Sequence, residues 1–311
     1  MTMPQDFIGV DIAKSWIDVH FLSTGTDQRI QTTDQGLSGF AQAARGCFVT
    51  FEASGFYTRA VSQALDKAGV SYACLNPRQV RDFARFTGKL AKTDRLDAQV
   101  LARMGQMVQP KPTPPTDQDR LRLTDLVARR DDLVGLIGAE RNRVQQVQDG
   151  WISEEISRLL NVLKDHLGRV EAQIAALVAA QGPLAEANRR LQSMPGIGPV
   201  LGPVLIARLP ELGQMDRRQI ASLAGLAPHA CDSGLHRGKR RIWGGRADVR
   251  RALYLAAFIA SRRDPTFKAF RSRLQTAGKP PKLAITACAR KLLTILNAMV
   301  RNDQDYRKHA T

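Results

Sequence analysis

The chain has 311 residues and a formal net charge of +17. This length exceeds that of most single domains, so we expect two or three domains. The charge is concentrated in one region: residues 191–311 hold 22 basic and 7 acidic residues, whereas residues 1–109 carry a net charge of +2 and residues 110–190 carry none. This distribution excludes an evenly charged surface and indicates a C-terminal region that binds a polyanion.

The chain is not expected to contain a membrane span. Its longest apolar stretches, such as Val200 to Leu209, are short and are interrupted by glycine or proline. Residues 1–10 also lack the charged and apolar regions of a signal peptide. We therefore expect a cytoplasmic, nucleoid-associated protein with no membrane partner.

The first hundred residues follow the pattern of an α/β sheet. Residues 7–11 and 16–21 predict two strands joined by a tight turn at 13–15, so a β-hairpin opens the chain. Residues 47–52 predict a third strand, a helical pattern follows from Tyr57 to Ala68, and residues 71–75 predict a further strand. Strands that alternate with helices after a hairpin favour an α/β fold.

The Pro-rich stretch 110–115 marks the first domain boundary, because proline cannot continue a helix or a sheet. Leucine, isoleucine and valine then recur with heptad spacing from Leu123 to Leu177, which predicts two long helices broken near residues 149–150. The segment has no net charge and a narrow apolar seam. These features favour a coiled coil that joins two chains, in preference to a hairpin within one chain. We expect three parts: 1–109, 110–190 and a helical part at 191–311.

Four acidic residues are candidates for a metal site. Asp11 and Glu52 each end a predicted strand, and Asp94 and Asp97 lie three residues apart at the start of a helical pattern. Strand ends converge at one edge of an open α/β sheet, and a nearby helix adds two acids on one face. Each acid alone is better explained as a helix cap or ion-pair partner, but the set together favours Mg²⁺, with Mn²⁺ as a substitute.

The stretches that carry these acids resemble a known family. Residues 7–14 (FIGVDIAK), 51–55 (FEASG) and 92–98 (KTDRLDA) resemble the catalytic stretches of the DEDD transposases, which include Piv-type DNA invertases and bridge-RNA-guided recombinases. The resemblance implies an RNase H-like (RuvC-like) N-terminal domain. It also implies that Asp11, Glu52, Asp94 and Asp97 form the metal-binding tetrad.

A second set of motifs resembles the same family. Residues 224–228, 232–234, 238–242 and 249–254 resemble its transposase domain, and the likeness extends over about residues 7–299. The resemblance implies that Ser233, just before a glycine, is the nucleophile that becomes joined to DNA; Ser222 is a weaker candidate. It further implies a homo-oligomer, a dimer or tetramer, and in some members a structured non-coding guide RNA.

Two features predict contacts with nucleic acid. The turn Pro195-Gly196-Ile197-Gly198 resembles a helix-hairpin-helix, in which glycine N–H groups bind phosphate; the alternative is an ordinary helix turn. A dense basic run follows further along the otherwise all-helical C-terminal part, and such a run is typical of phosphate binding. Its members are Arg237, Lys239, Arg240, Arg241, Arg246, Arg250 and Arg251.

Together these features predict a metal-dependent DNA strand transferase that uses a serine nucleophile. One alternative is a Holliday-junction-type nuclease, in which the same tetrad activates water and Ser233 is structural. Another is a passive nucleic-acid-binding protein whose acids are caps and ion-pair partners. A covalent adduct between protein and DNA distinguishes the strand transferase from the nuclease, and metal-dependent cleavage excludes the passive binding protein.

Overall fold

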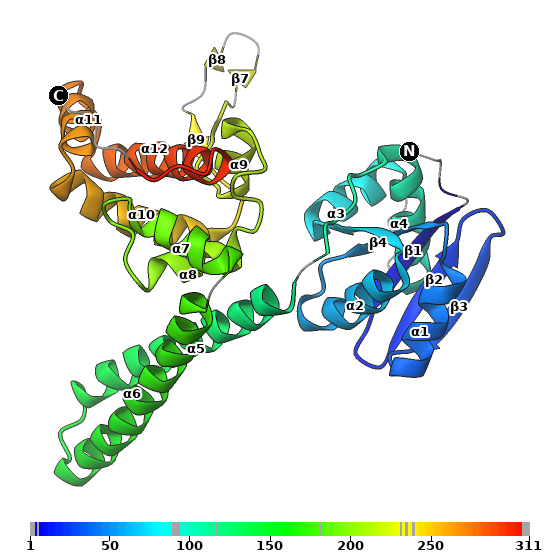
Figure 1. Ribbon diagram of the computed structural model, residues 1–311, viewed down its shortest axis with the longest axis horizontal. Coiled ribbons are helices and arrows are strands. Elements are labelled where there is room, and N and C mark those ends of the chain that lie inside the picture. The colour runs from blue at the N-terminus through cyan, green and yellow to red at the C-terminus, as the bar shows by residue number, and fades with distance from the viewer. Residues whose placement is uncertain are drawn as a thin grey trace. The chain divides into compact units, whose positions relative to one another are not determined.

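A computed structural model describes residues 4, 6–88, 94–115, 117–180, 182–230, 232–233, 236–237 and 240–306. The side chains of residues 56, 94–96, 232–233 and 236–237 lie outside this description. The chain divides into two compact units, Met1–Pro115 and Thr116–Thr311 (Figure 1). Each unit has its own hydrophobic core.

The first unit is built on a mixed five-stranded sheet. The strands β1 (Phe7–Ile12), β2 (Trp16–Phe21), β3 (Thr26–Gln31), β4 (Phe48–Glu52) and β5 (Ser71–Leu75) lie in the order β3-β2-β1-β4-β5. The strands β1, β2 and β3 pair antiparallel, whereas β4 pairs parallel with both β1 and β5. This arrangement confirms the α/β fold predicted from the hairpin and the strands that follow it, and the RNase H-like fold that the family resemblance implies.

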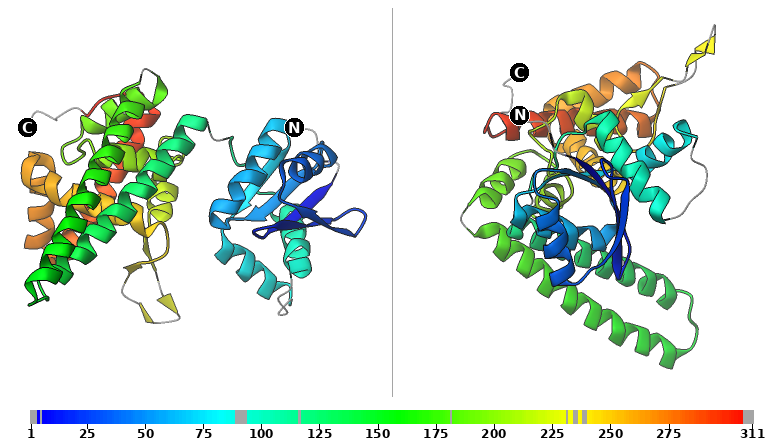
Figure 2. Two further views of the ribbon diagram at one scale, coloured as in Figure 1. Left: turned by 90° about the horizontal axis from the view of Figure 1, so that it is seen from below. Right: turned by 90° about the vertical axis from the view of Figure 1, so that its right-hand side faces the viewer.

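Helices cover both faces of this sheet (Figure 2). On one face, α1 (Asp34–Ala43) and α2 (Thr58–Ala68), preceded by a 3₁₀ turn at Gly55–Tyr57, bury Leu37, Phe40, Val61 and Leu65 against β1, β2 and β4. On the other face lie α3 (Pro77–Phe86) and α4 (Asp94–Val108). Here α4 contacts β1, β2 and β4 and packs against α3.

The second unit begins with a long helical hairpin. The helices α5 (Gln118–Val144) and α6 (Gly150–Ala179) confirm the predicted pair of long helices, and they pack against each other within the chain. Asp117 and Asp149 cap the two N-termini, and Arg130 pairs with Glu171 across the hairpin at 2.8 Å. Leu133 is buried inside it, so part of the heptad seam is satisfied without a second chain.

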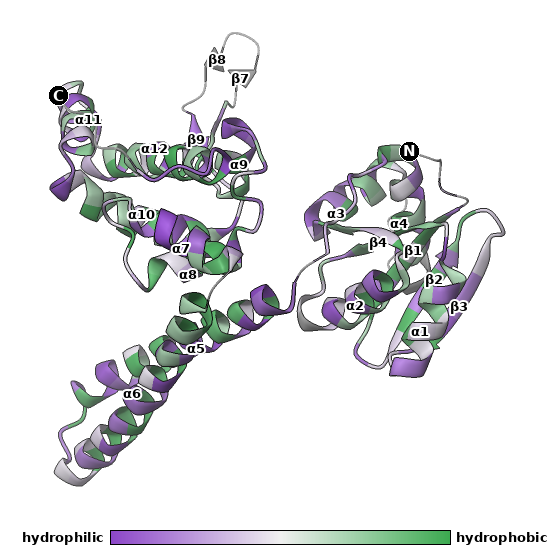
Figure 3. Ribbon diagram, viewed as in Figure 1, coloured by the Kyte–Doolittle hydropathy of each residue, from purple (hydrophilic) through white to green (hydrophobic). Residues whose placement is uncertain are grey.

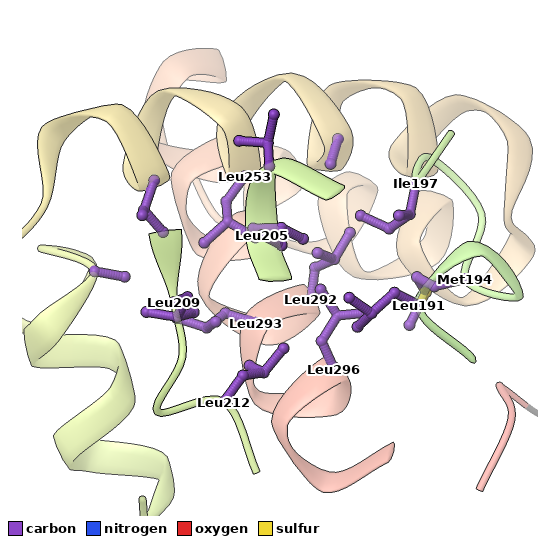
Figure 4. Close-up of a cluster of buried hydrophobic side chains, with 14 of the residues drawn as sticks. Leu191, Met194, Ile197, Leu205, Leu209, Leu212, Leu253, Leu292, Leu293 and Leu296 are labelled. Atoms are coloured by element: carbon purple, nitrogen blue, oxygen red, sulfur yellow. The ribbon is translucent and has the colours of Figure 1, made fainter. Parts of the chain in front are cut away.

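The remaining helices form a compact body. These are α7 (Pro183–Gln192), α8 (Leu201–Arg208), α9 (Arg217–Leu223), α10 (Ala247–Arg263), α11 (Pro265–Thr276) and α12 (Pro281–Arg301). Figure 4 shows leucines of α8, α10 and α12 meeting in its core, together with Leu191 and Met194. Leu123 and Val127 of α5 and Ile174 and Val178 of α6 join the same core, so it anchors the base of the hairpin.

Among the described helices, α12 is long and apolar enough to cross a membrane by length and composition. Most of it is coloured hydrophobic in Figure 3. Half of the apolar segment of α12 is buried in the helical body, where Leu292, Leu293 and Leu296 are fully buried. Core helices of globular proteins have the same properties, and α12 is the central core helix of this body.

The helical unit also contains a small β arm between α9 and α10. The strand β6 (Pro228–His229) pairs antiparallel with β9 (Arg241–Ile242), and β7 (Asp232–Ser233) pairs antiparallel with β8 (His236–Arg237). The sequence predicts a helical C-terminal part and not these strands. Paired strands of two residues are too short to produce a recognisable alternation of apolar and polar positions.

Candidate functional site

The first two candidate acids lie on neighbouring parallel strands. The register pairs Val10 of β1 with Phe51 of β4, so the next residues, Asp11 and Glu52, stand side by side at the carboxyl ends of both strands. Side chains alternate between the faces of a sheet, so Asp11 shares a face with Gly9, and Glu52 shares it with Thr50. Both acids are half-buried on the face that α4 covers.

Glycine allows α4 to lie directly on this face. A Cβ on Gly9 would overlap the backbone oxygen of Ala98, and a Cβ on Gly105 would come within 2.9 Å of Thr50 Cγ2. The Thr50 hydroxyl is fully buried and donates to the carbonyl of Leu101 at 2.7 Å. A Cβ on Gly105 would also come within 3.4 Å of the Phe7 ring. Because Ala98 lies over Gly9 whereas Gly105 lies near Phe7, two residues earlier in β1, the N-terminus of α4 lies toward the carboxyl ends of the strands.

This orientation places the second pair of acids at the same edge. Asp94 begins α4 and Asp97 directly precedes Ala98, the residue that contacts β1. Among the side chains that the structure describes, no three acidic, histidine or cysteine residues group closely enough to hold a metal ion. The Asp94 side chain lies outside that description. The donors are all carboxylates, which are the hard oxygen ligands that Mg²⁺ and Mn²⁺ accept.

The structure adds a neighbour that the sequence analysis did not single out. Asp18 of β2 stands directly opposite Asp11, so their side chains share one face of the sheet. Asp18 is buried and accepts two hydrogen bonds from the Arg29 guanidinium, both at 2.9 Å. The Arg29 fork offsets the repulsion between the facing carboxylates. The polar residues of W-I-D-V-H-F, at every second position of β2, carried the signal for this face.

Ser233 and Ser222 lie in different settings. Ser233 is the second residue of β7 and pairs with His236 of β8, while its side chain lies outside the described set. At the base of the arm, His229 and Trp243 rings contact each other at 5.2 Å between centroids. Ser222 is exposed on α9, where its carbonyl accepts from Gly225 N.

The base of the arm is fixed to the helical body by backbone contacts between glycines. Gly225 and Gly245 both have positive φ, +65°, and an added Cβ on either one would overlap backbone atoms of the facing segment. Arg250 donates to the Gly244 carbonyl at 2.7 Å. Arg246 makes two hydrogen bonds to Glu211, at 2.7 and 2.6 Å. These two arginines of the basic run therefore brace the arm.

The five other members of the run fall into two groups. Arg240, Arg241 and Arg251 are exposed. The side chain of Arg237 and the whole of Lys239 lie outside the described residues. The three exposed arginines are open to solvent, whereas the guanidinium groups of Arg246 and Arg250 already make hydrogen bonds within the chain.

The two glycines of the predicted helix-hairpin-helix turn have different surroundings. Gly196, with φ +95°, packs against the carbonyl of Ala256 in α10, where a Cβ would overlap it. Gly198 has no atom within 4 Å of the position of an added Cβ. Gly196 is therefore needed for helix packing, and Gly198 leaves the turn accessible before α8.

A mixed sheet of this order, with carboxylates at the ends of its two adjoining parallel strands, defines the RNase H-like class of nucleic-acid enzymes. Comparison with known families agrees with this class. Residues 8–151 match a family described as "Transposase", and residues 188–272 match one described as "Transposase IS116/IS110/IS902 family". The first match covers the sheet unit and α5, and the second extends from within α7 to within α11 of the helical body.

Relatives extend the comparison to the whole chain. The pilin gene-inverting proteins of Moraxella bovis and Moraxella lacunata are each 29% identical over 319 residues, which cover 98% of this chain and 99% of theirs. The 43.6 kDa protein of insertion element IS110 from Streptomyces coelicolor is 33% identical over 47% of this chain and 36% of its own length. This chain belongs to the IS110 family of DEDD transposases, which are DNA strand-transferring enzymes. Membership implies DNA binding and the use of a divalent metal ion.

Proposed function

We propose that this chain cuts and rejoins DNA with a carboxylate tetrad, Asp11, Glu52, Asp94 and Asp97, and with Ser233 as the nucleophile. The observation that carries the proposal is the adjacent placement of Asp11 and Glu52, beside which the N-terminus of α4 lies. Sequence separation is no obstacle, because the parallel register and the close contact at Gly9 bring the three segments to one edge.

The carboxylates suit a hard divalent cation. When bound by these four side chains, Mg²⁺ or Mn²⁺ would supply Lewis-acid stabilisation of the charge on a phosphodiester. The N-terminus of α4, where the positive end of a helix dipole lies, is at the same edge and favours negative charge there. Asp18 is a second carboxylate next to Asp11, and the Arg29 guanidinium that bonds to Asp18 offsets its negative charge.

The strand-transfer step conserves the energy of the broken bond. Ser233 Oγ forms a bond to phosphorus, the bond from phosphorus to one sugar oxygen breaks, and that oxygen takes up a proton. The resulting phosphoserine linkage is a phosphodiester of similar energy. A sugar hydroxyl therefore reseals the strand by the reverse displacement, without an external energy source. The exposed Arg240, Arg241 and Arg251 would hold the DNA backbone near β7.

The tetrad is tested by conservative removal of its charges. Asp11→Asn, Glu52→Gln and Asp97→Asn should each abolish strand cleavage in Mg²⁺, because each removes one ligand charge without changing side-chain size. Circular dichroism should show folded protein, and DNA retention should remain close to that of the parent chain. Full cleavage by an Asp11→Asn, Asp97→Asn double variant would remove the tetrad from the mechanism.

The serine is tested by the covalent adduct. Reactions stopped in denaturant should contain a DNA–protein species that protease digestion removes, and Ser233→Ala should lose this species while still binding DNA. Ser222→Ala is the matched control, since that hydroxyl is exposed on α9 and should be dispensable. If Ser233→Ala cuts at the parent rate and no adduct forms, water is the nucleophile, and the chain is a junction-type nuclease.

The proposal includes a homo-oligomer, a dimer or tetramer. The α5–α6 hairpin leaves large apolar side chains exposed, and these offer a contact surface for a second copy. Changing two of them, Leu159→Asp and Val162→Asp, should yield smaller particles in sedimentation velocity. Unchanged particles would exclude this face from the oligomer. The exposed set is Val134, Leu136, Trp151, Ile152, Leu159 and Val162.

The remaining proposed partner is a structured non-coding RNA. The proposed location of the protein is the nucleoid in the cytoplasm. Support comes from the resemblance to RNA-guided members of the family and from the net charge of +15 in residues 191–311. RNase treatment of the purified protein before DNA is added should abolish cleavage at a defined sequence. Cleavage that persists unchanged would remove the RNA from the mechanism.

A further inference from the structure

A basic groove lies on the helical body, away from the residues assigned above to DNA contact. Its hollow has a volume of about 510 Å³ between the start of α9 and the facing sides of α11 and α12. Ala287, Arg290, Lys291 and Thr294 form one stripe along α12, at the spacing that puts residues on a single helix face. Arg217, Arg218 and Phe270 complete the lining.

The cations of this groove are not neutralised by neighbouring acids. Within the described part of the chain, none of Arg217, Arg218, Arg290 and Lys291 forms an ion pair with an acidic side chain. The helices α11 and α12 together hold seven basic residues and no acidic one. By contrast, Arg130, Arg189, Arg190, Arg208 and Arg246 of the same unit are all paired with carboxylates.

The nearest acid in sequence has another role. The Asp216 carboxylate accepts hydrogen bonds from the backbone N–H groups of Arg218 and Gln219, at 2.6 and 2.9 Å, and it caps α9. These bonds lower the pKa of Asp216, which stays ionised as a cap. Four cations with one committed carboxylate beside them leave a net positive groove, which attracts a polyanion.

The lining selects the class of polyanion. Phe270 is the aromatic side chain in the groove, and its ring is already covered by Lys291 Nζ at 4.8 Å and by the Arg273 guanidinium at 5.3 Å. The Thr294 hydroxyl donates to the Lys291 carbonyl. The groove therefore offers charges without a free stacking surface or a hydroxyl donor for base edges. Such a lining suits the backbone of a duplex, whereas unpaired RNA bases are bound by stacking.

We propose that the groove of Arg217, Arg218, Arg290 and Lys291 is a second, sequence-independent binding site for the phosphate backbone of double-stranded DNA. It lies on a different set of helices from the β arm that carries Ser233 and Arg241, so it would hold the duplex at a separate point. The proposal rests on the family's action on DNA. It does not depend on the tetrad or on the serine as nucleophile.

The test is duplex-DNA binding by the full chain in EDTA, where cleavage is absent, over a series of salt concentrations. Two variants remove two cations each: Arg217→Gln with Arg218→Gln, and Arg290→Gln with Lys291→Gln. Each should reduce the slope of log K against log salt by about 1.8 and raise the Kd at 0.1 M salt by roughly 10- to 60-fold. Lys164→Gln with Arg169→Gln, exposed on α6, is the control of equal charge change and should leave the slope unaltered.

Two further arms make the result decisive. Arg217→Lys with Arg218→Lys keeps the charge and should keep the slope; its loss would mean that folding, and not charge, was measured. A hairpin RNA is titrated in parallel. An unchanged slope in both double variants, or a loss confined to RNA, overturns the proposal. The Ser233 adduct is measured separately, so a missing adduct with an altered slope rejects the serine mechanism and leaves the groove standing.

Discussion

Replacing Gly9 with alanine should leave the first unit folded but should reduce strand cleavage, because it displaces α4. An ideal Cβ at position 9 would lie 1.9 Å from the carbonyl oxygen of Ala98, whereas ordinary contact begins at 3.4 Å. The obstacle is backbone, which no rotamer change can remove, so α4 must move away from β1 by about 1.5 Å, the difference between these distances. Asp94 and Asp97 would move with it.

The expected effects differ in size. Overpacking at one buried site costs about 1–3 kcal/mol of unfolding free energy, so the unit should remain folded. A misplacement of about 1 Å between reacting groups costs on the order of 100-fold in rate, so strand cleavage in Mg²⁺ should fall by at least that factor. Urea denaturation and a gel-based cleavage assay measure the two quantities.

The control is Gly39→Ala on the exposed side of α1. No atom lies within 4 Å of its added Cβ, and alanine should stabilise that helix by about 0.5–1 kcal/mol without changing cleavage. Cleavage by Gly9→Ala at the parent rate would refute the placement of α4 over the strand ends. Equal stability changes in the two variants would refute the tight contact at Gly9.

Two more predictions concern the arm and a half-buried thiol. Gly244 and Gly245 share a positive φ, but only Gly245 faces backbone atoms, so Gly244→Ala should cost about 1 kcal/mol and Gly245→Ala about 2–5 kcal/mol in thermal or urea unfolding. Equal losses would show that φ alone matters there. Burial raises the pKa of Cys74 from 9.0 to about 11, which stabilises the protonated thiol. Iodoacetamide at pH 8 should therefore label Cys74 roughly 100-fold more slowly than an unperturbed thiol, measured by peptide mass spectrometry; equal labelling rates would contradict its burial.

The sequence predicted the central strands of the sheet better than its edge. The apolar runs of β1 and β4 and the alternation in β2 were sufficient, because these strands bury one or both faces. The strand β3, T-D-Q-R-I-Q, was missed because it pairs on one side only and is mostly exposed. The helices α1 and α3 were also missed, since few of their residues reach the core.

The strand-end positions were enough to identify Asp11 and Glu52 as candidates, but not to identify the residues that neighbour them. Whether Asp18 lies beside Asp11 depends on the register of the hairpin, which cannot be determined from the sequence alone. The heptads predicted the helices α5 and α6, yet their spacing is the same whether the seam meets a second helix of the same chain or another chain. Leu133 and Ile137 are buried within the chain, whereas Leu159 and Val162 are exposed.

The α5–α6 hairpin leaves and re-enters the helical body at one place, because Leu123 and Val127 enter the same core as Ile174 and Val178. Its length is therefore independent of that core. Inserting one heptad in each helix would move the tip outward by about 10 Å, at 1.5 Å per residue, and keep the apolar seam in phase. An engineered series of hairpin lengths would therefore measure how far from the helical body the partner of the tip lies.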